Sequence, residues 1–249
     1  MAGLFSNAVV LITGASRGIG LAITQAFARE GASLCLIARK QDALNALVDT
    51  LDLPPSKVMT LALDVTHRDA CFDAVDQTIK RMGHIDTLVN NAGIYQSQPF
   101  LNHTAADFQN MLDVNFFGVL HFMQACLPHM QQRQQGRIIN IASTAGKWGS
   151  RNQSAYNVSK HAVVGLTRCV ALEASPHQVT VNAICPGFFP SKMADGQISK
   201  MGDQMIEDTP LRRLGGEEDL KGIVVLLASE AGRHITGQAI AVDGGTMAM

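Results

Sequence analysis

Short apolar segments alternate with longer amphipathic segments along the whole chain. Seven short segments are apolar on both faces, the pattern of strands in a parallel sheet covered on both sides; they lie at residues 8–13, 33–38, 58–65, 86–93, 136–143, 179–187 and 239–245. Segments between them show helical periodicity, as at residues 18–31, where apolar residues recur and a glycine follows. The pattern predicts a three-layer, doubly wound α/β fold, a seven-stranded parallel sheet with helices on both faces.

Residues 188–216 interrupt this alternation. The segment carries several glycines, weak periodicity and the methionines Met193, Met201 and Met205. Because it directly follows the carboxyl end of a strand, we expect a lid-like insertion that covers a substrate, with a plain surface excursion as the alternative. The chain shows no internal repeat or long linker, so residues 1–249 are expected to form one domain.

Charge and cysteine usage narrow the classes of partner. The chain has 20 Lys and Arg against 21 Asp and Glu, which predicts neither a nucleic-acid nor a membrane partner. The N-terminal apolar stretch leads directly into a glycine loop, so we expect no cleaved signal. The five cysteines lack metal-type spacing; no metal site is predicted, and Cys35 and Cys169 are expected to be buried thiols. A cytoplasmic protein fits these features.

The glycine loop "TGASRGIG" (residues 13–20) lies between the first expected strand and the first expected helix. Gly14, Gly18 and Gly20 would allow a tight turn and a close approach of a pyrophosphate to the backbone, with the helix N–H groups facing the anion. A Gly-Lys-Ser/Thr sequence does not follow, which excludes a P-loop. The context therefore favours a dinucleotide site.

Further motifs follow this loop in a fixed order: "NNAG" (90–93), "YNVSK" (156–160), "CPG" (185–187) and the closing "ITGQAIAVDGG" (235–245). Together with the glycine loop they resemble the short-chain dehydrogenase/reductase family over essentially the whole chain. The resemblance implies a Rossmann fold and a nicotinamide cofactor. Its implied cofactor-binding residues are Gly14, Ser16, Arg17, Gly18, Ile19, Gly20, Arg39, Asp64, Val65, Asn91, Ala92, Gly93, Tyr156, Lys160, Pro186, Gly187, Phe189 and Ser191.

The end of the second expected strand favours NADP(H) over NAD. A carboxylate there would bind the adenosine ribose of NAD, but the chain has Ala38 followed by Arg39. The planar guanidinium group of an arginine can bind a 2′-phosphate through charge-assisted hydrogen bonds. The resemblance also assigns Asp64 to the adenine edge and gives Asn90 a structural task between strands. Ser191 stands where the family usually has threonine, which keeps the hydroxyl that would bond the carboxamide.

Four residues match the family's catalytic positions: Asn115, Ser143, Tyr156 and Lys160. A tyrosine has a pKa near ~10, and the Lys160 ammonium together with an oxidised nicotinamide would favour its phenolate. Tyr156 would then exchange a proton with a carbonyl whose oxygen Ser143 holds. The resemblance implies that Asn115 holds a water molecule on a proton path and that Lys160 binds the nicotinamide ribose.

The closing motifs look most like those of 3-oxoacyl thioester reductases, so the expected substrate is a small-molecule ketone or alcohol. A sugar-acid or polyol dehydrogenase and a non-catalytic dinucleotide sensor are the alternatives. Family members are usually dimers or tetramers, and "VNFFGVLHFMQACL" (114–127) is apolar around much of a helix. We therefore expect a homotetramer, or else a homodimer.

Overall fold

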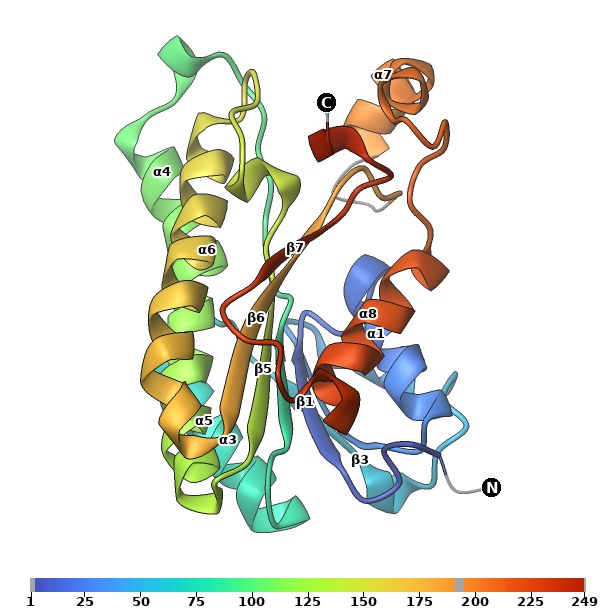
Figure 1. The fold of residues 1–249 in the computed structure, drawn as a ribbon, viewed down its shortest axis with the longest axis vertical. Coiled ribbons are helices and arrows are strands. Elements are labelled where there is room, and N and C mark those ends of the chain that lie inside the picture. Colours follow the sequence, from blue (N-terminus) through green and yellow to red (C-terminus); the bar gives the residue numbers. More distant parts are fainter. Residues whose placement is uncertain (1–2, 191–194, 249) are drawn as a thin grey trace.

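All seven expected strands form one parallel sheet, in the order β3-β2-β1-β4-β5-β6-β7 (Figure 1). This computed structural model describes residues 3–190 and 195–248, with side chains described outside residues 191–201. The strands are β1 (Val9–Thr13), β2 (Ser33–Ala38), β3 (Val58–Ala62), β4 (Thr87–Asn90), β5 (Gly136–Ile141), β6 (Val179–Pro186) and β7 (Ala239–Val242). The strand order changes direction between β1 and β4, where doubly wound sheets bind their ligands beyond the carboxyl ends.

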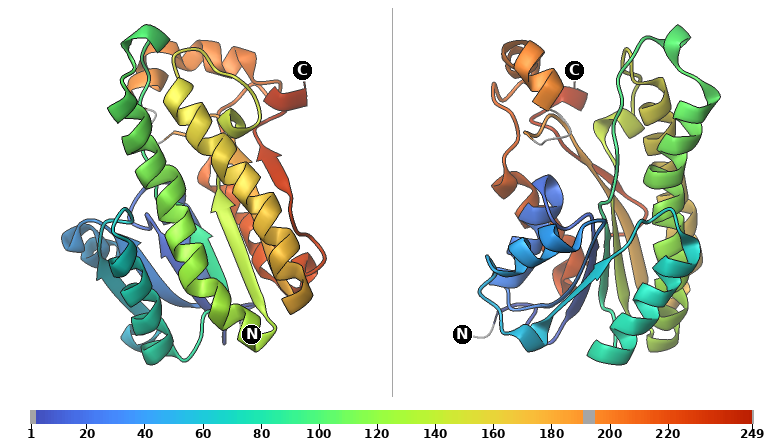
Figure 2. Two further views of the ribbon diagram at one scale, coloured as in Figure 1. Left: turned by 90° about the vertical axis from the view of Figure 1, so that its left-hand side faces the viewer. Right: turned by 180° about the vertical axis from the view of Figure 1, so that it is seen from behind.

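Helices cover both faces of the sheet, as the alternation predicted. They are α1 (Gly18–Arg29), α2 (Gln41–Val48), α3 (Arg68–Met82), α4 (Ala105–Leu112), α5 (Gly118–Arg133), α6 (Ser154–Ala174), α7 (Asp195–Asp208) and α8 (Glu217–Ala228). Figures 1 and 2 show α3, α5 and α6 on one face and α1 and α8 on the other. Among the helices that the structure describes, none is long and apolar enough to cross a membrane.

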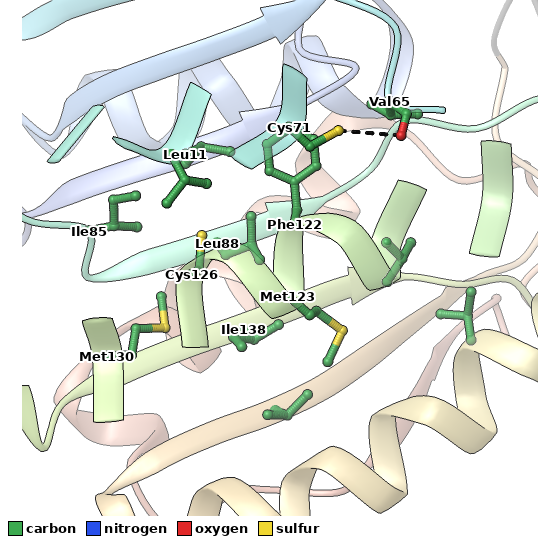
Figure 3. Packing of buried hydrophobic residues seen from close by; sticks show 14 of the residues in the cluster. Leu11, Val65, Cys71, Ile85, Leu88, Phe122, Met123, Cys126, Met130 and Ile138 are labelled. Carbon is green, nitrogen blue, oxygen red and sulfur yellow. Dashed lines mark hydrogen bonds between the residues drawn. The ribbon is translucent and has the colours of Figure 1, made fainter. Parts of the chain in front are cut away.

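The core divides into two apolar layers, one on each face of the sheet. In β1, Leu11 packs toward the layer under α3, α5 and α6, while Val10 and Ile12 pack toward the layer under α1 and α8. Figure 3 shows Phe122 of α5 lying against Leu11 and its neighbours. Because both faces are covered, alternate residues of each central strand are buried on opposite sides, which explains the nearly continuous apolar runs.

Several strands end earlier than predicted at their carboxyl ends. β3 ends at residue 62 rather than 65, β4 at 90 rather than 93, β5 at 141 rather than 143, and β7 at 242 rather than 245. The residues that follow leave the ladder and bond locally: Asp64 accepts hydrogen bonds from Thr66, and Ser143 accepts one from the N–H of Ala145. Apolar patterning does not mark this change from ladder to turn.

The segment 188–216 contains a helix that its weak periodicity did not predict. α7 (Asp195–Asp208) lies beyond the carboxyl ends of the strands (Figure 1). Met205 is buried, whereas the side chains of Met193 and Met201 lie outside the described residues. A covering role for this segment stays a prediction.

A chain of buried amides ties α6 to the middle of the sheet. Asn90 of β4 donates to Oδ1 of Asn140 in β5 at 2.9 Å, and Asn140 donates to Oγ1 of Thr167 in α6 at 2.9 Å. All three residues are buried, so each hydrogen bond made here avoids a large desolvation cost. The expected structural role of Asn90 between strands is confirmed. The hydrogen bond from Asn140 to Thr167 also holds α6 against the sheet.

The outward face of α6 corrects one expectation. Cys169 is exposed rather than buried, and it lies near the 79% exposed Leu172 on the same side of the helix. The buried face of α6 instead runs through Val163, Thr167 and Ala171. Periodicity alone left the orientation of this helix undecided because both of its faces carry apolar residues.

Candidate active site

The glycine loop turns tightly between β1 and α1. Gly14 and Gly18 have φ angles of +63° and +52°, which glycine adopts without the cost of a side chain. A Cβ added to Gly20 would lie 2.1 Å from the carbonyl oxygen of Gly14, so the first turn of α1 also needs a glycine there. The sequence prediction of a glycine-dependent turn at this point is therefore matched by backbone geometry.

The "NNAG" segment is hydrogen-bonded to the glycine loop and to the last residue of β1. The side-chain amide of Asn91 donates to the carbonyl oxygens of Thr13 and Gly14, at 3.1 and 3.0 Å. The hydroxyl of Thr13 accepts from the backbone N–H groups of Asn91 and Ala92, both at 3.0 Å. Thr13 was missed by the sequence reasoning; a hydroxyl at the last position of an otherwise apolar strand was the available signal.

Two arginines stand near the start of α1 and the end of β2. Arg17 is exposed and is the N-cap of α1, and no side chain caps this helix among the described residues. Arg39 is exposed and follows Ala38, the last residue of β2. Between the glycines, Ser16 and Ile19 are half-buried. The N-terminus of α1 and both arginines are thus available to a phosphate-bearing ligand.

Asp64 lies at the same end of the sheet as Arg39. Burial alone would raise the pKa of the Asp64 carboxyl, but hydrogen bonds from the Thr66 N–H and hydroxyl, together with the Arg39 charge, lower it. A lowered pKa keeps this carboxylate ionised and able to accept a hydrogen bond. The neighbouring Val65 is buried and belongs to the core layer under α3 and α5.

Ser143, Tyr156 and Lys160 come together at the carboxyl end of β5. The Ser143 hydroxyl lies close enough to the Tyr156 phenol to lower the pKa of that group. Lys160 is buried, donates from Nζ to the carbonyl oxygen of Ile141 at 2.9 Å, and lies 5.7 Å from the centre of the Tyr156 ring. The helical spacing of Tyr156 and Lys160 therefore places both groups on the face of α6 that meets the sheet.

Burial shifts both titrating groups of this cluster. It raises the pKa of Tyr156 to about 12, opposed by the hydrogen bond with Ser143. It also lowers the pKa of Lys160 to about 8. In the protein alone, desolvation of the phenolate thus outweighs the attraction that we expected from Lys160, so the hydroxyl form of Tyr156 is strongly favoured.

Asn115 joins the site to a π-helical turn at Asp113–Phe117 between α4 and α5. Its amide oxygen accepts from the N–H of Ile94 at 2.8 Å, and its Nδ2 donates to the carbonyl oxygen of Ile94 and to Oγ of Ser159, both at 3.0 Å. Ser159 in turn donates to the carbonyl oxygen of Tyr156 at 2.7 Å. π-helical turns often mark functional sites. The side chain of Asn115 is thus engaged in linking two segments of the site, a role that sequence reasoning missed.

Of the remaining expected cofactor residues, Gly93 lies beside the cluster, and Gly187 and Phe189 follow β6. A Cβ on Gly93 would lie 3.2 Å from Oδ1 of Asn115 and 3.8 Å from Nζ of Lys160. Gly187, which follows Pro186, packs so closely on Asp243 that a Cβ would lie 2.8 Å from its Cα. Phe189 is buried and borders a cavity of about 490 Å³. Ser191 lies outside the described residues.

Tyr95 is a further aromatic residue at the site that the motifs did not reveal. Its ring meets the Tyr156 ring edge to face, with centroids 5.0 Å apart and planes at 82°. The signal in the sequence was an aromatic residue two positions after "NNAG". The cluster therefore contains two tyrosines, a serine and a buried lysine. Hydroxyl and ammonium groups of this kind can bind a substrate oxygen atom and transfer a proton.

Among the residues that the structure describes, no group of three or more His, Cys, Asp or Glu side chains could hold a metal ion.

Comparison with known proteins finds close relatives over the full fold. Residues 8–202 match the family model described as short chain dehydrogenase. The 3-oxoacyl-[acyl-carrier-protein] reductase FabG of Thermotoga maritima is 35% identical over 237 residues, 95% of this chain and 96% of the relative. The crystal structure of levodione reductase superposes with a TM-score of 0.94 at 32% identity over 98% of this chain and 99% of that one. A structure of ElxO with NADP bound gives 0.90 at 29%, covering 97% and 99%.

Proposed function

The chain belongs to the short-chain dehydrogenase/reductase family, and from this premise we propose that it is an NADPH-dependent reductase of ketones, most specifically of a 3-oxoacyl thioester. The family makes it an oxidoreductase with a nicotinamide cofactor. The observation that carries the proposal is the cluster that brings Ser143 and Tyr156 together beside the buried Lys160. Two hydroxyl groups and one ammonium can together receive a carbonyl oxygen and supply its proton.

The residues at the carboxyl ends of β1 and β2 fit a dinucleotide with a 2′-phosphate. The uncapped start of α1 offers N–H groups to a pyrophosphate. Arg39, with Arg17 across the loop, offers positive charge where a dinucleotide's ribose phosphate would lie, and Ala38 leaves no carboxylate to repel it. When bound, NADPH supplies a hydride for carbonyl reduction. ElxO, a structural relative of the chain, has a structure with NADP bound.

Tyr156 is the proton donor in this proposal. Its raised pKa keeps the hydroxyl protonated at neutral pH, the form that reduction needs. Ser143 would hold the carbonyl oxygen and stabilise negative charge as it develops there. A charged Lys160 would lower the pKa of Tyr156 in the reverse direction, when the phenol must accept the proton as phenolate.

The substrate class rests on the relatives rather than on a described pocket. The FabG relative is named for reduction of a 3-oxoacyl group on an acyl carrier protein. Levodione reductase, whose structure superposes with a TM-score of 0.94, is named for another compound. A sugar-acid or polyol dehydrogenase is the second enzyme hypothesis. A dinucleotide sensor is disfavoured because Asn115, Ser143, Tyr156 and Lys160 are all present.

The direct test is NADPH oxidation by the purified protein with a short 3-oxoacyl thioester, with NADH in a parallel assay. Turnover with NADPH is the expected result. Turnover of sugar acids or polyols, with none of the thioester, would move the assignment to the second enzyme hypothesis. Faster turnover with NADH would contradict the assignment of Arg39.

Arg39→Ser is expected to weaken NADPH binding by about 10- to 100-fold, because charge-assisted hydrogen bonds are worth about 1.5–3 kcal/mol. NADH binding should change little, since NADH lacks the 2′-phosphate. Calorimetric titration of both cofactors measures the two affinities. Lys40→Ser removes the neighbouring exposed cation and serves as the matched control; an equal loss in both variants would indicate a general charge effect.

The exposed face of α6 favours a homotetramer, with a homodimer as the alternative. Val158, Cys169 and Leu172 lie on this face, and Phe117 at the start of α5 is 36% exposed. An apolar stripe of this kind is typical of a face covered by another subunit. Light scattering at micromolar concentration is expected to give a mass close to four times that of the 26.7 kDa chain. The mass of a monomer would contradict the assignment.

We propose a small-molecule carbonyl compound as the partner of the site and the cytoplasm as the compartment. The formal net charge of −1 gives no electrostatic reason to expect a nucleic-acid partner. All five cysteines are free thiols, as a reducing compartment favours.

A further inference from the structure

The only two tyrosines of the chain lie against each other at the candidate active site. Tyr95 meets Tyr156 edge to face, a geometry in which the positive edge of one ring faces the negative face of the other. The contact is made between segments far apart in the sequence, one following β4 and one in α6. A contact of this type restricts the orientation of the Tyr156 ring as well as its position.

The backbone next to Tyr95 is fixed by the amide of Asn115. Asn115 bonds both the N–H and the carbonyl of Ile94, the residue before Tyr95. The same amide bonds Ser159, which bonds the carbonyl oxygen of Tyr156. One buried side chain therefore sets the backbones that carry both tyrosines, so their rings meet at a defined distance.

The segment after Tyr95 is anchored as well. We call residues 96–98 the strap. The carboxylate of Asp107 in α4 accepts from the side-chain amides of Gln96 and Gln98 at 3.1 and 3.2 Å. The backbone N–H of Gln98 donates to the carbonyl oxygen of Asn152 at 2.8 Å, which joins the strap to the loop before α6. These bonds hold the strap between α4 and the loop before α6.

We propose that Tyr95 is a positioning residue for Tyr156: its ring, held by Asn115 and the strap, keeps the catalytic phenol in the orientation that proton transfer requires. The inference rests on the proposed role of Tyr156 as the proton donor. The contact on which the inference rests is the edge-to-face packing of the two rings. A displacement of a reacting group by about 1 Å can cost about 100-fold in rate, so loss of this contact has a large effect although Tyr95 itself transfers no proton.

The kinetic test compares three variants. Tyr95→Leu removes the ring and is expected to lower kcat about tenfold or more, with the KM for NADPH unchanged. Tyr95→Phe keeps the ring and is expected to retain most of the activity. Phe100→Leu makes the same type of change on the 66% exposed Phe100, which lies beyond the strap, and should behave as the unaltered protein. Tyr95→Met replaces Tyr95→Leu if the leucine variant does not fold.

A spectroscopic test needs no turnover. Protein labelled with 3-fluorotyrosine should give two ¹⁹F resonances, one for each tyrosine of the chain, and Tyr156→Phe assigns them. In Tyr95→Leu the remaining Tyr156 resonance is expected to move because the neighbouring ring is gone. In Tyr95→Phe it should stay close to its original position.

The outcomes separate this inference from the proposed function. A moved Tyr156 resonance with reduced kcat in Tyr95→Leu, rescued by Tyr95→Phe, supports the positioning role. An unmoved resonance with unchanged kcat overturns it, as does an equal loss in both variants, which would assign the role to the hydroxyl. Absence of thioester turnover in the unaltered protein would count against the proposed substrate; kcat is then measured with whichever carbonyl compound is reduced.

Discussion

Replacing Tyr156 by phenylalanine is expected to lower kcat by about 100- to 10,000-fold, the range in which a positioned general acid contributes. The ring stays, so packing against Tyr95 is kept, while the hydroxyl beside Ser143 is removed. Steady-state NADPH oxidation gives the loss of kcat, and calorimetry should find NADPH binding largely retained.

The effect of pH on the unaltered enzyme provides an independent check. Reduction needs the hydroxyl form of Tyr156, whose pKa is raised by burial, so kcat for reduction should stay level through neutral pH and fall only on the alkaline side. Oxidation of the alcohol needs the phenolate and should rise with pH. A Tyr156→Phe enzyme with unchanged kcat would remove this tyrosine from the chemistry.

Replacing Lys160 by methionine is expected to abolish most of the activity and, at the same time, to change how stability depends on pH. Burial lowers the pKa of Lys160 from 10.5 to about 8. Below the lower value the folded protein carries a buried charge that the unfolded chain exposes to water. With about 1.4 kcal/mol for each pKa unit, this costs the folded state about 3 kcal/mol at neutral pH.

The direction in which the free energy of unfolding changes with pH follows from proton binding at Lys160. Between about pH 8 and 10.5 the unfolded chain binds more protons at Lys160 than the folded protein, so this group makes the free energy of unfolding rise with pH across that window. Lys160→Met lacks the rise. Urea unfolding at several pH values measures both proteins without cofactor, and Lys80→Met on the exposed surface of α3 is the matched control. Parallel pH profiles for the unaltered protein and Lys160→Met would contradict a buried ammonium.

The sequence was sufficient to predict the parallel sheet, the glycine turn and the common helix face of Tyr156 and Lys160, because these depend on local pattern. Gly14 and Gly18 adopt positive φ angles that few other residues tolerate, and the spacing of Tyr156 and Lys160 fixes their common helix face. Asn90 was expected to tie strands together, and it bonds Asn140 of the next strand.

What the sequence could not predict depends on tertiary contacts. The edge-to-face contact of Tyr95 with Tyr156 joins two distant segments and follows no spacing rule. The pairing of Asn115 with Ile94 and Ser159 requires the π-helical turn, which apolar periodicity does not reveal. The exposure of Cys169 depends on how α6 is rotated against the sheet. The direction of the pKa shift at Tyr156 reflects how deeply its surroundings exclude water.

The strand order also determines how the chain can reach its native state. Every pairing in the sheet is parallel, so no two neighbouring strands are joined by a hairpin, and β1 pairs with β4 across more than 70 residues of sequence. Closing such long loops before contacts compensate for the lost chain entropy makes folding slow relative to helical or hairpin-rich proteins of similar stability. Because the hydroxyl of Ser143 and the helix of Tyr156 are assembled only when β5 joins β4 and α6 covers the sheet, recovery of activity after dilution from denaturant reports completion of the sheet rather than its initiation.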